Sequence, residues 1–221
     1  MAVFPVFLKL DKRRVLVVGA GPVAAGKVRP LVEAGARVTV VAPDVVDDIA
    51  AMAAFITIVR RPFAPNDVEG AWYVVAAAPP EVNRAVARAA EARCLFVNAV
   101  DDLESASAYA GAIVQKAGVT LALSTDGEAP ALTGLMREAL EMLLPEELDR
   151  WMACAQEARR RWLAQGVPMA ERRPMLLQAM NDLYERKRAA DNTEHTDRKQ
   201  ARDNAEARTA GVAVSARLQP L

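Results

Sequence analysis

Short apolar runs alternate with helical stretches through the first hundred residues of the chain. Each run has the length and composition of a buried strand, and the expected strands are Val15–Val18, Val38–Val41, Ile56–Val59, Trp72–Ala76 and Leu95–Val97. Helices are expected between them at Val23–Glu33, Val45–Ala53 and Glu81–Arg93. Alternation of this kind predicts the α/β fold class, with a doubly wound parallel sheet and right-handed crossovers.

The pattern changes after Asp101. Two strands are expected to pair antiparallel, at Ala112–Gln115 and Val119–Ser124. Three helices follow, at Ala129–Leu144, Glu146–Leu163 and Pro174–Arg188. Beyond them, the only apolar residues up to Arg208 are alanines, which is typical of frayed helix or disorder.

The composition restricts the classes of function. The chain has 221 residues, and its 28 basic side chains balance 28 acidic ones, so it has no basic footprint for nucleic acid and no polybasic membrane patch. No apolar run approaches the ~20 residues that cross a bilayer. Two cysteines cannot form a disulfide framework, which favours a reduced, cytoplasmic protein. Because His195 is the single histidine, neither a catalytic triad nor a protein-held metal is expected.

The sharpest local signal is a glycine-rich turn, Gly19-Ala20-Gly21-Pro22-Val23-Ala24, between a predicted strand and a predicted helix. Gly19 allows the tight turn, Gly21 lets a pyrophosphate approach the backbone, and Ala24 permits close packing of the helix on the strand. The helix N-terminus offers free N–H groups to the phosphates. A glycine-rich turn without a ligand is the alternative, but the context favours dinucleotide binding by a Rossmann-like domain.

The end of the second strand reads Val41-Ala42-Pro43-Asp44. An NAD site usually has an acid at this point, which holds the ribose hydroxyls. Here the acid is displaced past a proline, so either Asp44 or backbone groups near Pro43 are expected to take that role. No Arg follows the strand, which favours NAD over NADP. After the fourth strand, Ala77 and its alanine neighbours leave room for a ligand, although close helix packing explains them equally well.

Asp101 follows the fifth strand, at the edge of a parallel sheet where ligands bind. Partial burial would raise its pKa, and a like charge on Asp102 would add to that rise, so Asp101 is a candidate general acid or base. The alternative, about equally favoured by spacing alone, is that the two aspartates end a strand in solvent.

Hydroxyl side chains precede the helix expected at Ala129–Leu144, in the sequence Ser124-Thr125-Asp126-Gly127-Glu128. They could meet an anion, but capping of the helix is the safer interpretation, and the two roles are compatible.

Together these motifs resemble the precorrin-2 dehydrogenase / sirohydrochlorin ferrochelatase family, which includes the N-terminal half of bifunctional siroheme synthases. The resemblance runs from Phe4 to about Leu144. It is carried by the order and spacing of FPVFLKLDKRRVLVVGAGPVAAGKV, VAAAPPEVN, FVNAVDD, and STDGEAPAL before LMREALE.

The resemblance implies NAD-dependent oxidation of precorrin-2 to sirohydrochlorin, a step toward sirohaem or cobalamin. In some members the same site also inserts ferrous iron. The implied site residues are Pro22, Val23, Pro43 and Asp44 for NAD, Asp101 as the acid/base residue, and Asn98, Ser124 and Thr125 beside the tetrapyrrole. The chain departs from the family's commoner Gly-Gly/Ser-Pro pattern in having Asp126, Glu128 and Ala129, and the two acids would repel a polycarboxylate unless they point away.

Residues 105–144 are too few for a separate domain, so their apolar faces are expected to be buried against a second copy. The resemblance likewise implies an intertwined homodimer. We therefore expect an NAD-binding domain at 1–111, a dimerisation segment at 112–145, a helical domain at 146–188 and a polar, disordered tail at 189–221.

A non-catalytic module that senses NAD(H) is the alternative function, since one fold serves many functions. It predicts nucleotide binding without tetrapyrrole binding.

Overall fold

The computed structural model describes residues 3–185, so the tail expected at 189–221 lies outside the described residues. The described chain divides into two compact units, residues 3–114 with 120–143 and residues 115–119 with 144–185. Every candidate site residue named above belongs to the first unit.

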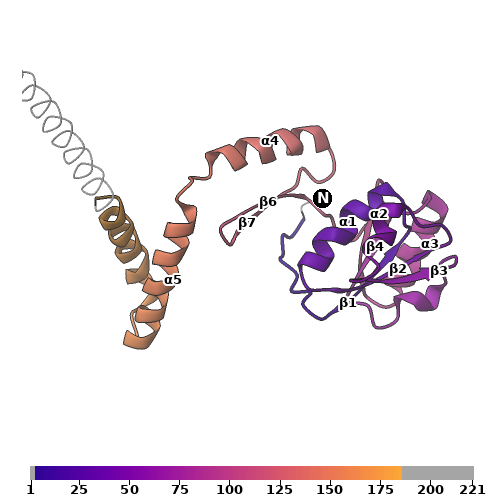
Figure 1. Cartoon of the computed structure of the whole chain (residues 1–221), viewed down its shortest axis with the longest axis horizontal. Helices are drawn as coiled ribbons and strands as arrows, with labels where there is room; N and C mark the ends of the chain where they lie inside the picture. Colours follow the sequence, from indigo (N-terminus) through magenta and orange to yellow (C-terminus); the bar gives the residue numbers. More distant parts are fainter. Residues whose placement is uncertain (1–2, 186–221) are drawn as a thin grey trace, which may run out of the picture. The chain divides into compact units, whose positions relative to one another are not determined.

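Five strands form one parallel sheet in the first unit (Figure 1), namely β1 (Arg14–Val18), β2 (Arg37–Ala42), β3 (Thr57–Arg60), β4 (Tyr73–Ala76) and β5 (Phe96–Ala99). Their order is β3-β2-β1-β4-β5, and every neighbouring pair is parallel. The structure thus confirms the Rossmann-like, doubly wound sheet. The strand order reverses between β1 and β4, and ligands bind at the carboxyl edge beside such a reversal.

Helices cover both faces of the sheet. Alternate residues of β1 point to opposite faces: Val15 and Val17 join the core under α1 (Pro22–Glu33) and α2 (Asp47–Ala50), and Leu16 joins the core under α3 (Pro80–Glu91). These β1 side chains have no exposed surface. The helix expected at Val45–Ala53 is shorter than predicted, because turns replace its last part.

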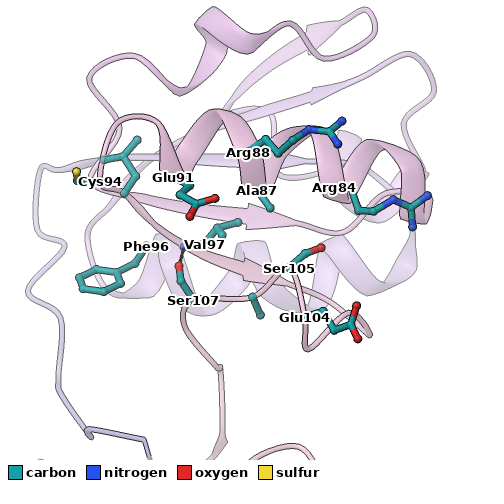
Figure 2. A pocket seen from close by; sticks show the side chains of 12 residues that line it. Arg84, Ala87, Arg88, Glu91, Cys94, Phe96, Val97, Glu104, Ser105 and Ser107 are labelled. Atoms are coloured by element: carbon teal, nitrogen blue, oxygen red, sulfur yellow. Dashed lines mark hydrogen bonds between the residues drawn. The ribbon is translucent and has the colours of Figure 1, made fainter. Parts of the chain in front are cut away.

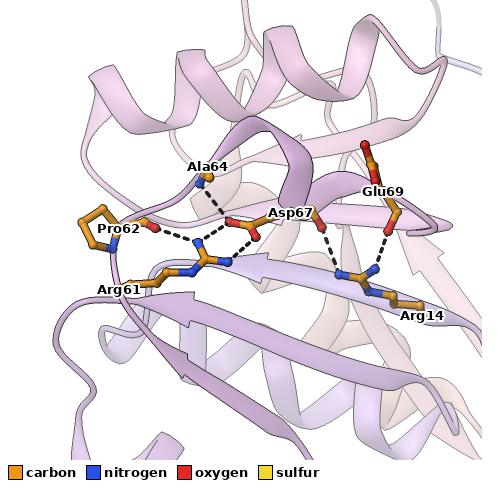
Figure 3. A network of polar contacts seen from close by, with 6 residues as sticks. All are labelled: Arg14, Arg61, Pro62, Ala64, Asp67 and Glu69. Atoms are coloured by element: carbon orange, nitrogen blue, oxygen red, sulfur yellow. Dashed lines mark hydrogen bonds and ion pairs between the residues drawn. The ribbon is translucent and has the colours of Figure 1, made fainter.

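Charged side chains hold the connection between β3 and β4 (Figure 3), which contains the short 3-10 helix η1 (Pro65–Val68). Arg61 donates to both carboxylate oxygens of Asp67, at 2.5 and 2.8 Å. This hydrogen-bonded pairing holds the pKa of Asp67 below its ordinary value. Arg14 donates to the backbone carbonyls of Asp67 and Glu69, which ties the connection to the start of β1.

A hairpin and a helix follow the sheet. β6 (Ala112–Lys116) and β7 (Val119–Leu123) pair with each other. Ala117 and Gly118 between them have φ of 49° and 80°, a type I′ turn that makes the strands antiparallel, as predicted. α4 (Pro130–Leu143) comes next.

The described part of the second unit contains α5 (Leu148–Gln165) and a helix over residues 169–185. Gly166 ends α5 in the left-handed conformation. The predicted start of the last helix at Pro174 is wrong, because the helix begins directly after Pro168. Proline's fixed φ is compatible with a helix, so Pro174 is accommodated at the loss of one backbone hydrogen bond. Among residues 3–185, no helix is long and apolar enough to cross a membrane.

Candidate functional site

The turn after β1 is shaped by the close approach of Gly19 to the loop after β4. Gly19 has a φ of 100°, and a Cβ built on it would lie 2.1 Å from the carbonyl oxygen of Ala77. Because any side chain would collide with this backbone, the fold itself requires glycine at position 19. The contact joins the ends of β1 and β4 where the strand order reverses.

Gly21 is a glycine for a different reason. Its φ of −84° is open to any residue, and apart from Gly21 and its two chain neighbours no described residue has an atom within 4 Å of a Cβ built there. Pro22 begins α1 without an N–H, and no side chain caps the N–H groups of Val23 and Ala24 behind it. Open space beside an uncapped helix N-terminus fits a phosphate group. The turn therefore fits the pyrophosphate of a dinucleotide.

The loop after β2 lies beside the glycine turn, because the N–H of Val46 donates to the carbonyl oxygen of Ala20 at 3.1 Å. Pro43 and Asp44 in this loop are exposed, so the Asp44 carboxylate is accessible to a ribose at the same edge. The register of β3 adds a residue that the sequence did not suggest: Arg60 pairs with Ala42, which brings an exposed guanidinium to this edge.

A buried amide joins the loops that follow β4 and β5. Asn83, in the first turns of α3, is 3% exposed. Its Oδ1 accepts the N–H of Ala78 at 3.0 Å, and its Nδ2 donates to the carbonyl oxygen of Val100 at 3.3 Å. The two bonds end one residue from Ala77 and one residue from Asp101.

Asp101 stands in a tight turn directly after β5. The N–H of Val100 continues the sheet by donating to Ala76, and Asp101 then takes a left-handed φ of 58°. Its side chain is exposed, so of the two interpretations that the sequence left open, a strand end in solvent fits the single chain. The neighbouring Asp102 is occupied otherwise, because hydrogen bonds from the side chain and N–H of Ser105 hold its pKa below the ordinary value.

Asn98 lies inside β5 and is 7% exposed. Its side chain is hydrogen-bonded to the phenol of Tyr73, on the same face of the sheet. Burial raises the pKa of the Tyr73 phenol, and the bond with Asn98 opposes that rise. The amide thus supports the sheet beside the site, and its contact with a tetrapyrrole stays a prediction.

The hydroxyls of Ser124 and Thr125 serve the turn before α4. Thr125 Oγ1 accepts the N–H of Ala129 at 3.2 Å and lies 2.9 Å from Thr133 Oγ1, so this hydroxyl stabilises the turn that enters α4. Because the accepted N–H precedes the first helical residue, Pro130, capping of the helix stays a prediction. Ser124 Oγ accepts the N–H of Asp126 at 3.0 Å.

This turn also contacts the loop that carries Asp101. A Cβ built on Gly127 would lie 2.5 Å from the side chain of Leu103, two residues after Asp101. The structure therefore brings Ser124 and Thr125 to the same part of the unit as Asp101, through a contact that the sequence did not predict.

A separate hollow of about 580 Å³ lies between α3 and residues 104–107 (Figure 2). Arg84 and Arg88 of α3 line one side of it, and Ser105 and Ser107 line the other. None of the candidate site residues lines this hollow. Among residues 3–185, no group of three His, Cys, Asp or Glu side chains is placed to hold a metal ion.

The residues that sequence reasoning missed act through tertiary contacts. Asn83 ends the motif VAAAPPEVN, but its two bonds depend on the meeting of two loops. Arg60 follows from the β2–β3 register, and Leu103 follows from its contact with Gly127. An asparagine among the alanines of a helix was the one local signal available.

Comparisons with known proteins agree with this geometry. Residues 6–112 match the model of a putative NAD(P)-binding family, which confirms the prediction of dinucleotide binding. Siroheme synthase 3 of Aeromonas hydrophila subsp. hydrophila is 41% identical over 176 residues, and the siroheme synthase of Salmonella schwarzengrund is 38% identical over 172 residues. The alignments cover 78% and 76% of this chain but 38% of each relative, so the chain spans well under half of their length.

A solved structure shows the same fold over most of its length. SirC, a precorrin-2 dehydrogenase, superposes with a TM-score of 0.67 at 26% identity, covering 82% of this chain and 92% of that one. The three comparisons agree: the chain contains a putative NAD(P)-binding region, it is similar in sequence to part of the siroheme synthases, and it is similar in structure to the precorrin-2 dehydrogenase SirC.

Proposed function

We propose that this chain is an NAD-dependent precorrin-2 dehydrogenase, which oxidises precorrin-2 to sirohydrochlorin. The observation that carries the proposal is the convergence of the phosphate-binding turn and Asp101 at one edge of the sheet. Gly19 approaches Ala77, and Asn83 links the same loop to Val100, beside Asp101. The match to SirC over 92% of its length agrees with this activity.

The reaction removes two hydrogens from the macrocycle, one as a hydride and one as a proton. NAD, when bound, supplies the acceptor for the hydride. The N–H groups at the start of α1 hold the pyrophosphate, and Asp44 holds the ribose. Asp101 accepts the proton, because within residues 3–185 no hydrogen bond or ion pair occupies its exposed carboxylate. Holding both partners in place supplies much of the rate.

The cofactor in this proposal is NAD rather than NADP. Asp44 offers a carboxylate to the two ribose hydroxyls, and the same carboxylate would repel a 2′-phosphate. Arg60 is a cation at the same edge, because its strand partner Ala42 lies two residues before Asp44. In this proposal the Asp44 carboxylate outweighs Arg60 in setting the preference for NAD.

The substrate is held, in this proposal, by the turn before α4 and the end of β5. Ser124 is exposed, and its hydroxyl accepts the Asp126 N–H. The O–H of Ser124 is still free to donate a hydrogen bond to the substrate. Thr125 and Asn98 contribute through the backbone that their side chains fix.

We propose that the chain works as a homodimer in which a second copy covers α4. This helix exposes large apolar side chains on successive turns, with Leu132, Leu135, Met136, Met142 and Leu143 between 44% and 81% exposed. An apolar row of this extent is typical of a protein interface. The division into an NAD-binding domain at 1–111, a dimerisation segment at 112–145 and a helical domain at 146–188 is part of this proposal.

Insertion of ferrous iron into sirohydrochlorin is a second reaction for the same site. The accessible Asp101 carboxylate favours it, because metal insertion requires a base that takes the pyrrole protons. Iron is a substrate in this step. A reducing, cytoplasmic location suits both reactions, and Cys94 and Cys154 are both free thiols.

The test is anaerobic incubation of the protein with precorrin-2 and NAD while NADH absorbance is followed. We expect NADH and sirohydrochlorin in equal amounts. Folded protein that binds NAD but forms no NADH would overturn the proposal. NAD binding without any shift of the tetrapyrrole spectrum on titration would favour a non-catalytic NAD(H)-sensing module instead. Adding ferrous iron to sirohydrochlorin without NAD tests the second reaction separately.

A further inference from the structure

Two neighbouring loops at the candidate site share one buried side chain. The loop after β4 contains Ala77, and the loop after β5 contains Asp101. These loops are joined by Asn83, whose Oδ1 accepts the Ala78 N–H at 3.0 Å and whose Nδ2 donates to the Val100 carbonyl at 3.3 Å.

The chemistry of this link requires an amide. The loop after β4 presents a donor, the Ala78 N–H, and the loop after β5 presents an acceptor, the Val100 carbonyl. One side chain that is 3% exposed makes a hydrogen bond to each of them. An asparagine carries an acceptor and a donor on one short planar group. An ionised aspartate carries acceptors and no donor. Water cannot readily replace the amide at a site so little exposed.

The two side-chain hydrogen bonds of Asn83 are not needed to form α3. The helix begins at Pro80 and follows Pro79, and the Asn83 N–H already makes an ordinary helical bond to the Pro79 carbonyl. The side chain instead reaches out of the helix to both loops. The left-handed turn at Asp101 begins directly after the carbonyl that Asn83 holds.

We propose that Asn83 is a positioning residue for the dehydrogenase reaction: it holds the turn that carries Asp101 at a fixed distance from the loop that lines the cofactor site. Asn83 touches neither substrate nor cofactor in this account. It sets where the Asp101 carboxylate stands relative to the nicotinamide end of the site. The inference rests on the proposed function, because it assumes that Asp101 takes the proton.

The decisive variant is Asn83→Asp, which has nearly the same shape. One carboxylate oxygen still accepts the Ala78 N–H, so the cofactor loop keeps its bond. The other oxygen can keep the bond to the Val100 carbonyl only while the carboxyl is protonated, a form that burial and the facing carbonyl favour. The assays are therefore run at alkaline pH, where the ionised carboxylate has no proton to donate and the bond to the Asp101 loop is lost. We expect kcat to fall at least about tenfold, because small displacements of a reacting group cost this much or more. The dissociation constant for NAD should stay within about threefold of the wild-type value, because the cofactor loop is unchanged.

Asp67→Asn is the matched control. It also replaces a hydrogen-bonded side chain by its near-isostere, but it acts in the connection between β3 and β4, outside the site. Its kcat and NAD affinity should equal those of the wild type. If Asn83→Asp does not fold, Asn83→Ser is measured in the same way, since a hydroxyl is too short to join both loops. We expect its kcat to fall by a larger factor than its NAD affinity.

The outcomes separate this inference from the proposed function. If the wild type oxidises precorrin-2, Asp101→Asn is inactive and the Asn83 variants keep the wild-type kcat, the inference is wrong and the proposed function stands. A loss of NAD affinity as large as the loss of kcat would also overturn it, because Asn83 would then support the fold of the cofactor site as a whole. An active Asp101→Asn variant would instead overturn the proton-accepting role of Asp101.

Discussion

Gly19 lies against the carbonyl of Ala77 so closely that a Cβ on Gly19 would be 2.1 Å from that oxygen. The second glycine of the same turn, Gly21, has open space around the corresponding position. Gly19 and Gly21 are therefore glycines for different physical reasons. The first is needed by the fold, and we propose that the second leaves room for a ligand that approaches the backbone.

Opposite effects are expected from substituting these glycines. Gly19→Ala should destabilise the protein by roughly 3 kcal/mol or more, because the methyl group collides with backbone at a left-handed residue. Gly21→Asp should leave the melting temperature unchanged or raise it slightly, since aspartate is a favourable N-cap worth up to about 1 kcal/mol. Its charge should weaken NAD binding more than about tenfold, because it lies where the pyrophosphate approaches. Thermal unfolding and NAD titration measure both effects.

Gly26→Ala is the control for this pair. Gly26 lies on an exposed position of α1, and outside its own stretch of the helix no described atom lies within 4 Å of a built Cβ, so alanine should stabilise the protein by about 1 kcal/mol and leave NAD binding unchanged. Equal NAD affinities for the wild type and Gly21→Asp would contradict the placement of the pyrophosphate.

Asp101 is expected to show a conflict between stability and activity. Its φ of 58° suits glycine or asparagine better than aspartate. Asp101→Gly should therefore raise the free energy of unfolding by up to about 1 kcal/mol, and Asp101→Asn should leave it nearly unchanged. Both variants should bind NAD as the wild type does and lose turnover. Chemical denaturation and NADH formation are the measurements, and turnover by Asp101→Gly would remove this residue from the mechanism.

The local parts of this site could be predicted from the sequence, because they depend on short-range rules. Val15–Val18 is a short continuous apolar run, which is typical of a buried strand, and the glycines that follow it mark a turn into a helix. The contact of Gly127 with Leu103 and the pairing of Arg60 with Ala42 depend on segments that meet only after folding. The burial of Asp101 was left open by the sequence for the same reason, since the strand end could be located but its surroundings could not.

The pairing of Asp67 with Arg61 predicts a dependence of stability on pH. The folded pKa of Asp67 is lowered, so the pair stabilises the protein fully above the unfolded pKa of about 4, and this stabilisation is lost as the pH falls through the folded value. At neutral pH, Asp67→Asn should cost about 1 kcal/mol, a small value because Arg61 is half exposed. Denaturation at several pH values should show the variant and the wild type converging in acid. A difference that persists unchanged at pH 2 would contradict the assignment.

The cofactor preference should depend on Asp44. Asp44→Ser removes the carboxylate that repels a 2′-phosphate, and Arg60 remains at the same edge as a cation. We expect the ratio of NADP to NAD affinity to rise by about tenfold, equivalent to 1.4 kcal/mol. Titration of both dinucleotides measures it. Addition of Arg60→Ala to this variant should reverse most of the gain, and a gain that survives would exclude Arg60 as the partner of the phosphate.

The apolar row on α4 should hold two copies of the chain together. Leu135 is 65% exposed, and Leu135→Glu would place a charge in the centre of the proposed interface. We expect this variant to sediment as a monomer at concentrations where the wild type is a dimer. Phe55→Glu is the control, because Phe55 is similarly exposed, at 70%, but lies outside α4. A wild type that sediments as a monomer would contradict the proposed dimer.

The unequal surroundings of Gly19 and Gly21 have a consequence for large-scale mutational surveys. A survey that scores the amount of protein in cells will record position 19 as intolerant and position 21 as permissive. Only a survey that scores growth dependent on the activity of this enzyme is expected to register position 21. Positions that tolerate substitution in the survey of protein amount but not in the survey of growth would identify the residues that contact the cofactor, without a crystal structure of the complex.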